Sequence, residues 1–329
     1  PLGHHAVNIF LHAVNVCLFY LLGLRICRAR RDQAHGPGTA DAGENTDQWP
    51  MICGMGSLAL LFGIHPAKVE SVAWVSDRKD LLCALFLLLS ALVYMRRGSP
   101  ERTRMMYGFS LLFFALGVLS KPVAIMFPCA LFALGYFLEP ADRSSRGLLM
   151  SIFRLIPFLL MSLAGGIVAG LVTLGGKPVS YLLHISLIEK ALLPAYTLLL
   201  YLRNFFWPVS LTPFYAPPES LTIWVSAVVL GAAGVGLFFL RRMKVPLLLS
   251  FAAYAILLLP TIIGNRTGIQ LWADRYSYIP GIPLFLLAGV ALSQALRRPP
   301  WAGISPNRIR AFTGILVLFV MVAAGYVTR

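Results

Sequence analysis

Residues 65–80, HPAKVESVAWVSDRKD, place a dense group of charged side chains between two long apolar segments. Three carboxylates, three cations, one histidine and one tryptophan fall within this stretch: Glu70, Asp77, Asp80, Lys68, Arg78, Lys79, His65 and Trp74. The flanking segments are typical of helices embedded in lipid. Because ionisable groups at a membrane boundary are energetically unfavourable, they usually mark a functional site. The position of this loop therefore decides both topology and function.

The composition argues against a large soluble domain. Of the 329 residues, 58% are hydrophobic and 12% are charged, and the mean hydropathy is +0.76. A soluble domain carries about 25% charged residues. Repeated apolar runs approach the ~20 residues needed to cross a bilayer. We therefore expect an all-α polytopic membrane protein, with residues 1–329 forming a single membrane domain and no soluble domain.

Ten apolar runs are expected to span the membrane, and an eleventh at about 187–206 is treated separately. The ten runs cover about 6–24, 50–64, 80–95, 105–120, 122–138, 154–174, 222–240, 245–263, 279–296 and 309–327. Clusters near the ends of these runs hold 18 of the 28 Lys and Arg residues. If 187–206 does not cross, every cluster falls on one side, which the positive-inside rule makes cytoplasmic.

The opposite, non-cytoplasmic side then receives the polar loop 65–80 and the long region 175–221. We expect 187–206 to be a re-entrant or interface-lying helix within that region, because irregular elements at membrane depth are tolerated where protein buries their backbone. The net charge of +15 does not indicate nucleic-acid binding, since the cations flank apolar runs and form no basic stripe. The five cysteines show no metal-binding spacing.

The first apolar run carries four polar residues on one helical face. His5, Asn8, His12 and Asn15 lie at offsets of 0, 3, 7 and 10 residues. A polar stripe in a membrane helix must face protein or water. It either forms hydrogen bonds that pack helices together or lines a polar cavity.

The loop 65–80 has its own pattern. If the loop is helical, Glu70, Trp74 and Asp77 share a face, because they lie at offsets of 0, 4 and 7 residues. Asp80 sits where the next helix begins and could cap it. The loop is either a salt-bridged interface segment or a site for a polar headgroup or a sugar.

Two cations outside this loop are candidates for binding an anion. Lys121 lies in a break between apolar runs, where the following helix N-terminus adds free N–H groups; alternatively, it extends to water. Arg275 lies in WADRYSY at 272–278, where it pairs with Asp274 within an aromatic belt or binds a phosphate as a planar fork donor.

Four segments together resemble a known family. They are HAVNIFLHAVN at 5–15, HPAKVESVAWVSDRKDLL at 65–82, LSKPVAIMFP at 119–128 and ADRYSYIP at 273–280. In this order they resemble the membrane portion of the transmembrane and tetratricopeptide-repeat-containing proteins, a family of protein O-mannosyltransferase-like enzymes of the GT-C type. The resemblance covers essentially the whole chain and implies a GT-C-like helix bundle.

The resemblance also implies an activity. It implies transfer of a hexose, mannose above all, from a polyprenyl- or dolichyl-phosphate carrier to a Ser or Thr hydroxyl of an acceptor protein, with inversion. Transfer would occur on the non-cytoplasmic side of the bacterial inner membrane or of the endoplasmic reticulum. Relative to the family, the chain lacks the first helix, its loop with the main catalytic Asp, and the C-terminal repeats. We expect this fragment to be inactive in isolation.

Five candidate site residues match positions of the family: Glu70, Arg78, Asp80, Lys121 and Arg275. Glu70 and Asp80 are the candidate catalytic carboxylates. The candidate lipid-phosphate ligands are Arg78, Lys121 and Arg275. The candidate substrate-cavity residues are His5, Asn8, His12, His65, Trp74, Asp274 and Tyr276. The cofactor requirement is open, with a divalent cation as a candidate. The alternatives are a transporter or lipid-linked-sugar flippase and a non-catalytic membrane scaffold.

Overall fold

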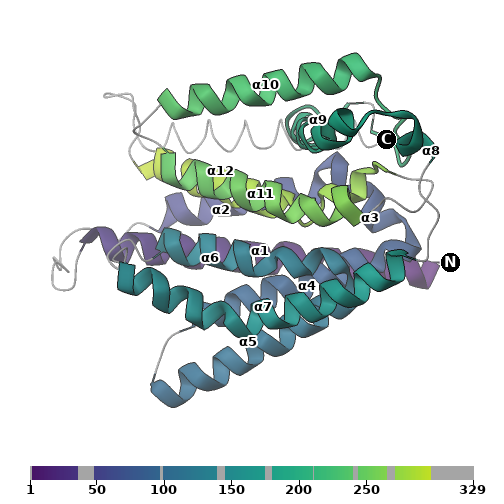
Figure 1. The fold of residues 1–329 in the computed structure, drawn as a ribbon. Helices are drawn as coiled ribbons and strands as arrows, with labels where there is room; N and C mark the ends of the chain where they lie inside the picture. The colour runs from purple at the N-terminus through teal and green to yellow at the C-terminus, as the bar shows by residue number, and fades with distance from the viewer. Residues whose placement is uncertain are drawn as a thin grey trace.

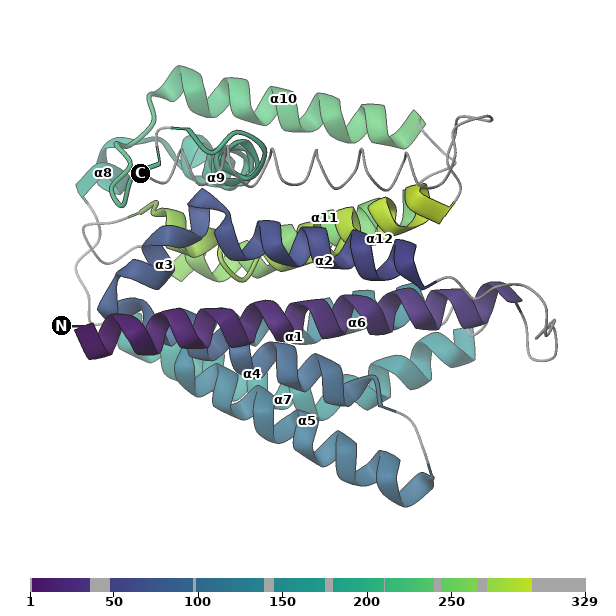
Figure 2. The same cartoon turned by 180° about the vertical axis from the view of Figure 1, so that it is seen from behind.

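The computed structural model describes residues 2–35, 48–96, 99–138, 145–174, 180–209, 211–239, 244–264 and 271–297. Within these ranges the chain is all-helical and contains no strand, which confirms the predicted class. The long helices run side by side in one bundle (Figures 1 and 2). They are α1 Leu2–His35, α2 Trp49–Ile64, α4 Arg78–Tyr94, α5 Pro100–Ser120, α6 Phe127–Leu138, α7 Ser145–Leu174, α10 Ser220–Phe239, α11 Lys244–Gly264 and α12 Gly281–Arg297.

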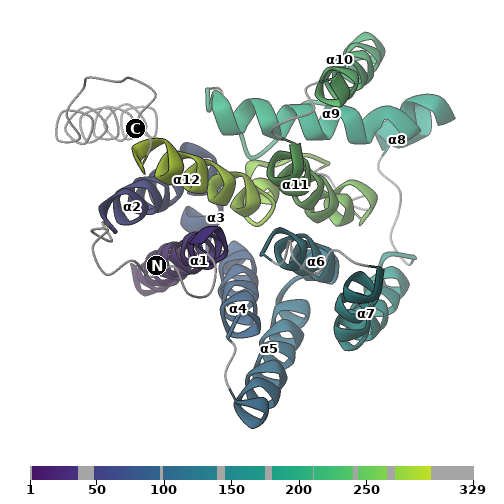
Figure 3. The ribbon, with the colours of Figure 1, turned by 90° about the vertical axis from the view of Figure 1, so that its left-hand side faces the viewer.

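One long helix departs from this direction. Helix α9, Leu187–Phe206, is seen end-on in Figure 1 and along its length in Figure 3, so it lies across the other helices. The short helix α8, Ser180–His184, precedes it. The apolar run predicted at 187–206 therefore has the same bounds as a helix that lies across the bundle axis.

Short helices connect the long ones at the end of the bundle where the chain begins. Residues 65–80, expected to be a loop, form η1 Pro66–Lys68, α3 Val69–Ala73 and η2 Val75–Asp77 and then enter α4. Two further 3-10 helices also precede long helices: η3 Pro122–Met126 precedes α6, and η5 Asp274–Ser277 precedes α12. Pro66 and Pro122 each occupy the first turn of their element, where no backbone N–H is needed.

The described residues include four helices long and apolar enough to cross a membrane: Leu2–Gln33, Pro100–Ser120, Gly147–Val172 and Val245–Ile262. Helix α2 and the segment Pro66–Ala73 pass the same test together but are bent by 56°. Three shorter apolar helices accompany them, Pro122–Leu138, Ser220–Gly236 and Gly281–Arg297. The run predicted at 309–327 lies outside the described residues.

The prediction for the first connection was wrong in one respect. The first span was expected to end at about residue 24, but α1 continues through Arg25, Arg28, Arg30 and Arg31 to His35. Arginine is a good helix former, and its side chain reaches away from the axis to a polar partner. Arg25 donates to the carbonyl of Leu92 near the end of α4.

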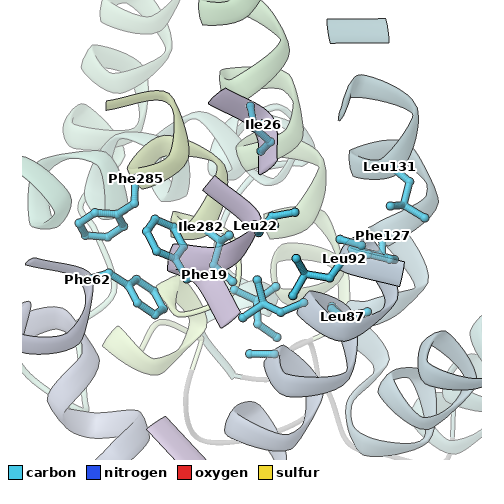
Figure 4. Close-up of a cluster of buried hydrophobic side chains, with 14 of the residues drawn as sticks. Phe19, Leu22, Ile26, Phe62, Leu87, Leu92, Phe127, Leu131, Ile282 and Phe285 are labelled. Carbon is cyan, nitrogen blue, oxygen red and sulfur yellow. The ribbon is translucent and has the colours of Figure 1, made fainter. Parts of the chain in front are cut away.

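The apolar core lies where α1, α2, α4, α6 and α12 meet (Figure 4). At its centre the rings of Phe19 and Phe62 stack with centroids 5.1 Å apart, and Phe285 meets Phe62 edge-on at 5.5 Å. All three side chains are fully buried. Since lipid is as apolar as these rings, packing complementarity holds such helices together more than removal from water does.

Helices α2 and α12 approach closely at a pair of small residues. A Cβ built on Gly54 would lie 2.4 Å from the Ser293 hydroxyl and 2.7 Å from Ser293 backbone atoms. Because backbone cannot give way as a flexible side chain can, this contact requires glycine. Gly56, on the same helix, has only an ordinary neighbour, with Tyr20 at 3.9 Å.

We expect Gly54→Ala to destabilise the bundle by about 1–3 kcal/mol through overpacking. Gly56→Ala is the matched control and should have little effect, because its new methyl meets no close atom. Thermal unfolding in detergent at a fixed scan rate measures both variants. Equal unfolding temperatures for the two would show that α2 and α12 are not packed through Gly54.

Candidate functional site

Charged residues from five parts of the chain meet at the end of the bundle where α1 begins. The rim cluster consists of Glu70 on α3, Asp77 on η2, Asp80 on α4, Lys121 before η3, and Arg275 on η5. Figure 1 shows α3 beside this end, whereas the arginine-bearing last turns of α1 and α12 lie at the other. The polar connections predicted at 65–80, 121 and 272–278 are therefore brought together in space.

Glu70 contacts Arg275 through both of its carboxylate oxygens. Glu70 Oε1 lies 2.5 Å from Arg275 Nη1, and Oε2 accepts a hydrogen bond from the Arg275 backbone N–H at 2.8 Å. Both side chains are 11% exposed. One carboxylate thus fixes the backbone and the guanidinium of Arg275 together.

A second ion pair lies beside the first. Lys121 Nζ is 2.5 Å from Asp80 Oδ1, and the Asp80 side chain is 1% exposed. Asp80 occupies the first turn of α4, where the helix dipole favours a negative charge. Lys121 sits in extended backbone between α5 and η3, so the predicted helix break is what directs it toward the site.

Two aromatic rings hold the cations of both pairs. The Arg275 guanidinium lies 4.9 Å from the Trp74 ring centroid and 5.0 Å from that of Tyr276. Lys121 Nζ lies 5.4 Å from the same Tyr276 ring. A ring face attracts cations through its quadrupole, so Tyr276 lets two like charges share one neighbourhood.

Asp77 links the two ion pairs and was not among the predicted site residues. Its Oδ2 is buried, has no hydrogen-bond partner among the described residues, and lies 3.7 Å from Arg275 Nε. Burial raises the pKa of Asp77, and the neighbouring Asp80 raises it further, while Arg275 and Lys121 oppose both. The shared face of Glu70, Trp74 and Asp77 was the sequence signal for it.

Lys68 was also missed as a site residue. It is 2% exposed, and its Nζ donates to the carbonyl of Ser277 at 2.9 Å and approaches that of Tyr278 at 3.4 Å. The ammonium also lies 5.7 Å from the Phe62 ring and 5.8 Å from the Phe285 ring. Lys68 therefore connects η1 to the end of η5.

The proposed pairing of Asp274 with Arg275 was wrong. Asp274 Oδ1 instead accepts hydrogen bonds from the Tyr215 hydroxyl at 2.6 Å and from Asn204 Nδ2 at 3.0 Å. Burial raises the pKa of Asp274 to about 6, although the Tyr215 hydrogen bond favours the charged form. Asp274 is 4% exposed, which fits a residue that anchors η5.

Helix α9 holds the segment that carries Arg275. The Tyr201 hydroxyl donates to the Ala273 carbonyl at 3.0 Å and accepts from the Ala273 N–H at 3.2 Å. Trp272 Nε1 donates to the Thr197 hydroxyl at 2.9 Å. The transverse helix thus contacts three consecutive residues, 272–274, through side chains on one of its faces.

The polar stripe of α1 packs helices together at three of its four positions. Asn8 Nδ2 donates to the carbonyls of Val72 and Trp74, and Asn15 Nδ2 donates to that of Leu81 at 2.9 Å. His12 lies 2.7 Å from the Tyr278 hydroxyl. These contacts favour the packing alternative over a cavity wall.

The remaining predicted residues lie apart from the rim cluster. His5 is exposed. Arg78 donates to Asn8 Oδ1 at 3.0 Å and to the His4 carbonyl at 3.2 Å, so it holds the start of α1. His65 is 5% exposed and lies 3.0 Å from the carbonyl of Phe205 on α9. Across the part of the chain that the structure describes, no group of three or more His, Cys, Asp or Glu could hold a metal ion.

Comparisons with known proteins show partial similarity to protein O-mannosyl-transferases. Human protein O-mannosyl-transferase TMTC4 is 38% identical over 100 residues, 29% of this chain and 12% of that protein. Xenopus laevis tmtc2 is 33% identical over 101 residues, 31% of the chain and 9% of its length. Drosophila melanogaster Tmtc1 is 33% identical over 98 residues, which are 29% of this chain and 9% of that protein.

The chain therefore matches only about a tenth of the length of these relatives. No protein-family model matches the chain. No solved structure matches it either. These findings place the chain near the named transferases in sequence without assigning it their activity.

We expect Asn204→Leu to lower stability by about 1–3 kcal/mol, because it leaves the buried Asp274 carboxylate with one hydrogen bond fewer. Arg203→Gln is the control, since Arg203 is an exposed neighbour on the same helix. Thermal unfolding in detergent measures both. A wild-type unfolding temperature in Asn204→Leu would contradict the anchoring of η5 by α9.

Proposed function

We propose that this chain is the membrane part of a protein O-mannosyltransferase, which moves a hexose from a polyprenyl- or dolichyl-phosphate to a protein Ser or Thr hydroxyl. The observation that carries the proposal is the rim cluster, where Lys121 and Arg275 meet over Tyr276 at one end of a membrane-type bundle. The partial similarity to proteins named O-mannosyl-transferases supports the same reaction.

The topology belongs to this proposal. About ten helices would span the membrane, with α9 lying re-entrant or at the interface, and the rim cluster would face the non-cytoplasmic side. The position of the arginine-bearing ends of α1 and α12 away from α3 supports this orientation, because Lys and Arg favour the cytoplasm. The site would then face the endoplasmic reticulum lumen or the bacterial periplasm.

In this reaction the carboxylates and the cations have different tasks. A carboxylate takes the proton of the acceptor hydroxyl as its oxygen attacks the anomeric carbon, the lipid phosphate leaves, and the configuration inverts. Arg275 and Lys121 would bind the leaving phosphate, and Glu70 and Asp80 would position them. A general base of this kind contributes roughly 10²–10⁴-fold.

An apolar cavity gives the lipid carrier a place to lie. It is lined by side chains of α1, α4, α6, α11 and α12 and by Ile279, four residues after Arg275. Its lining is almost entirely hydrocarbon, which suits an isoprenoid chain whose phosphate reaches the rim cluster.

A non-catalytic scaffold is the second candidate. The observation that favours it is that both cations are already paired with carboxylates, Arg275 with Glu70 and Lys121 with Asp80. Such pairs need no ligand to be stable. The two functions differ in whether removal of a cation abolishes sugar transfer.

We expect Arg275→Ala in the full-length protein to slow mannose transfer by about 10²–10³-fold, the usual effect of losing one preorganised donor to a developing anion. Arg275→Lys should recover only part of the rate, because an ammonium lacks the planar fork. Transfer from polyprenyl-phosphate mannose to proteins of a membrane extract measures the rates.

The control is Arg104→Ala, which removes an exposed arginine from the first turns of α5. It should transfer at the wild-type rate. Folding is checked by expression and thermal unfolding, and Arg275→Lys keeps the buried charge if the alanine variant unfolds. Wild-type transfer by folded Arg275→Ala and Arg275→Lys proteins would leave the scaffold as the better explanation.

A further inference from the structure

The charges of the rim cluster do not balance. With every group ionised, the three carboxylates of the rim cluster outnumber its two cations, Lys121 and Arg275, by one. Lys79 also faces Asp77, but it lies outside the cluster and is exposed to solvent, which screens its charge. A phosphate anion would add another negative charge to a largely buried site. Since charge repulsion is strong where water is excluded, the anion is disfavoured unless one carboxylate is neutralised.

Of the three carboxylates, Asp77 has the longest ion pair. Glu70 uses both of its oxygens on Arg275, and Asp80 forms a 2.5 Å ion pair with Lys121. Asp77 Oδ2 is buried without a hydrogen bond, as are both oxygens of Asp80. Asp80 has a close cation in compensation, whereas Asp77 Oδ2 lies 3.7 Å from Arg275 Nε, which is too long for a hydrogen bond. The Asp77 side chain is only 4% exposed, so water does not compensate it.

We propose that Asp77 takes up a proton from solvent when a phosphate anion binds between Lys121 and Arg275, so that the site binds its anion together with one proton. This inference rests on the phosphate site of the proposed function. Protonation removes the repulsion from Asp77 and makes its carboxyl a hydrogen-bond donor that a phosphate oxygen accepts. It also frees Arg275 Nε from a long ion pair, while Glu70 keeps the guanidinium in place.

The surroundings of Asp77 determine the direction of the pH effect. Asp80 and Lys79 face it from α4, Arg275 from η5 and Lys121 from the start of η3, with Glu70 beyond Arg275. The pKa of Asp77 is already raised, and a bound anion raises it further. Between the pKa values of the free and bound states, affinity therefore falls as pH rises, by at most about tenfold per unit for one proton.

The test uses the protein in lipid nanodiscs, titrated with farnesyl methyl phosphate and, separately, with dimethyl phosphate. Both probes carry a single charge that does not change between pH 5 and 8. Calorimetry in buffers of different ionisation enthalpy counts the protons taken up per anion bound. Uptake with both probes assigns the site to phosphate itself, and uptake with the farnesyl ester alone assigns it to a lipid-linked phosphate; either supports the inference.

Three variants locate the proton. Asp77→Asn should bind the farnesyl probe without proton uptake and with an affinity that does not change with pH. Asp80→Asn should still take up a proton, in a lower pH range, because a neighbouring negative charge has been removed. Glu101→Gln, an exposed carboxylate in the first turn of α5, is the control and should behave as wild type.

Two outcomes would overturn the inference while keeping the phosphate site. One is wild-type binding of the farnesyl probe without proton uptake, which needs no variant to fold. The other is unchanged uptake in Asp77→Asn. If neither probe binds at any pH, the phosphate site of the proposed function and the proton coupling both fail.

Discussion

The position of Arg275 between Glu70 and Asp77 is the constraint on which the rest of the site depends. The contact joins segments 205 residues apart in the chain. A buried ion pair adds little net stability, yet removal of one partner leaves an unpaired charge and costs about 3–5 kcal/mol. The pair therefore acts mainly as a register: once Arg275 meets Glu70, η5 has one place against α3, and Tyr276 falls between Arg275 and Lys121.

The surrounding structure supports η5 from two sides. On one side, the buried Lys68 ammonium binds the carbonyls at the end of η5. On the other, Thr197, Tyr201 and Asn204 contact residues 272–274 from α9. A helix parallel to the bundle would present only one or two turns to a segment at the bundle's end. Because α9 lies across the bundle, it offers several turns, which gives its orientation a structural reason.

The sequence predicted the elements well and their long-range partners poorly. Apolar runs and charge clusters located the helices, and the strict alternation of the clusters set 187–206 apart before α9 was seen to lie across the others. The same counting could not find the partner of Arg275. Asp274 looked suitable because it is adjacent, but neighbouring side chains on a 3-10 helix point about 120° apart. Adjacency in sequence therefore directed these two residues to different partners.

The residues that were missed share a physical cause. Lys68 and Asp77 are charged, and their local sequence gives no sign that they are buried, since burial comes from η5, α4 and α12 folding over them. His5 failed for the opposite reason: helical periodicity placed it on the polar face, but it is exposed, whereas Asn8 and Asn15 on that face are buried against α3 and α4. A stripe of polar residues predicts which face of a helix packs against protein. How far that contact extends along the helix depends on the positions of the neighbouring helices.

The pairing of every rim cation with a carboxylate has a chemical consequence. Unpaired cations at a membrane surface would bind any phosphate, including lipid headgroups, which are far more abundant than a sugar carrier. In the proposed phosphate site, a ligand would instead have to replace or neutralise an acid that already holds Arg275 or Lys121. Only a ligand with further contacts, such as a sugar and an isoprenoid chain, would offset that cost. If the site binds phosphate as proposed, its paired charges favour selectivity over affinity, and Asp77, which has the longest ion pair, is the carboxylate that would be neutralised.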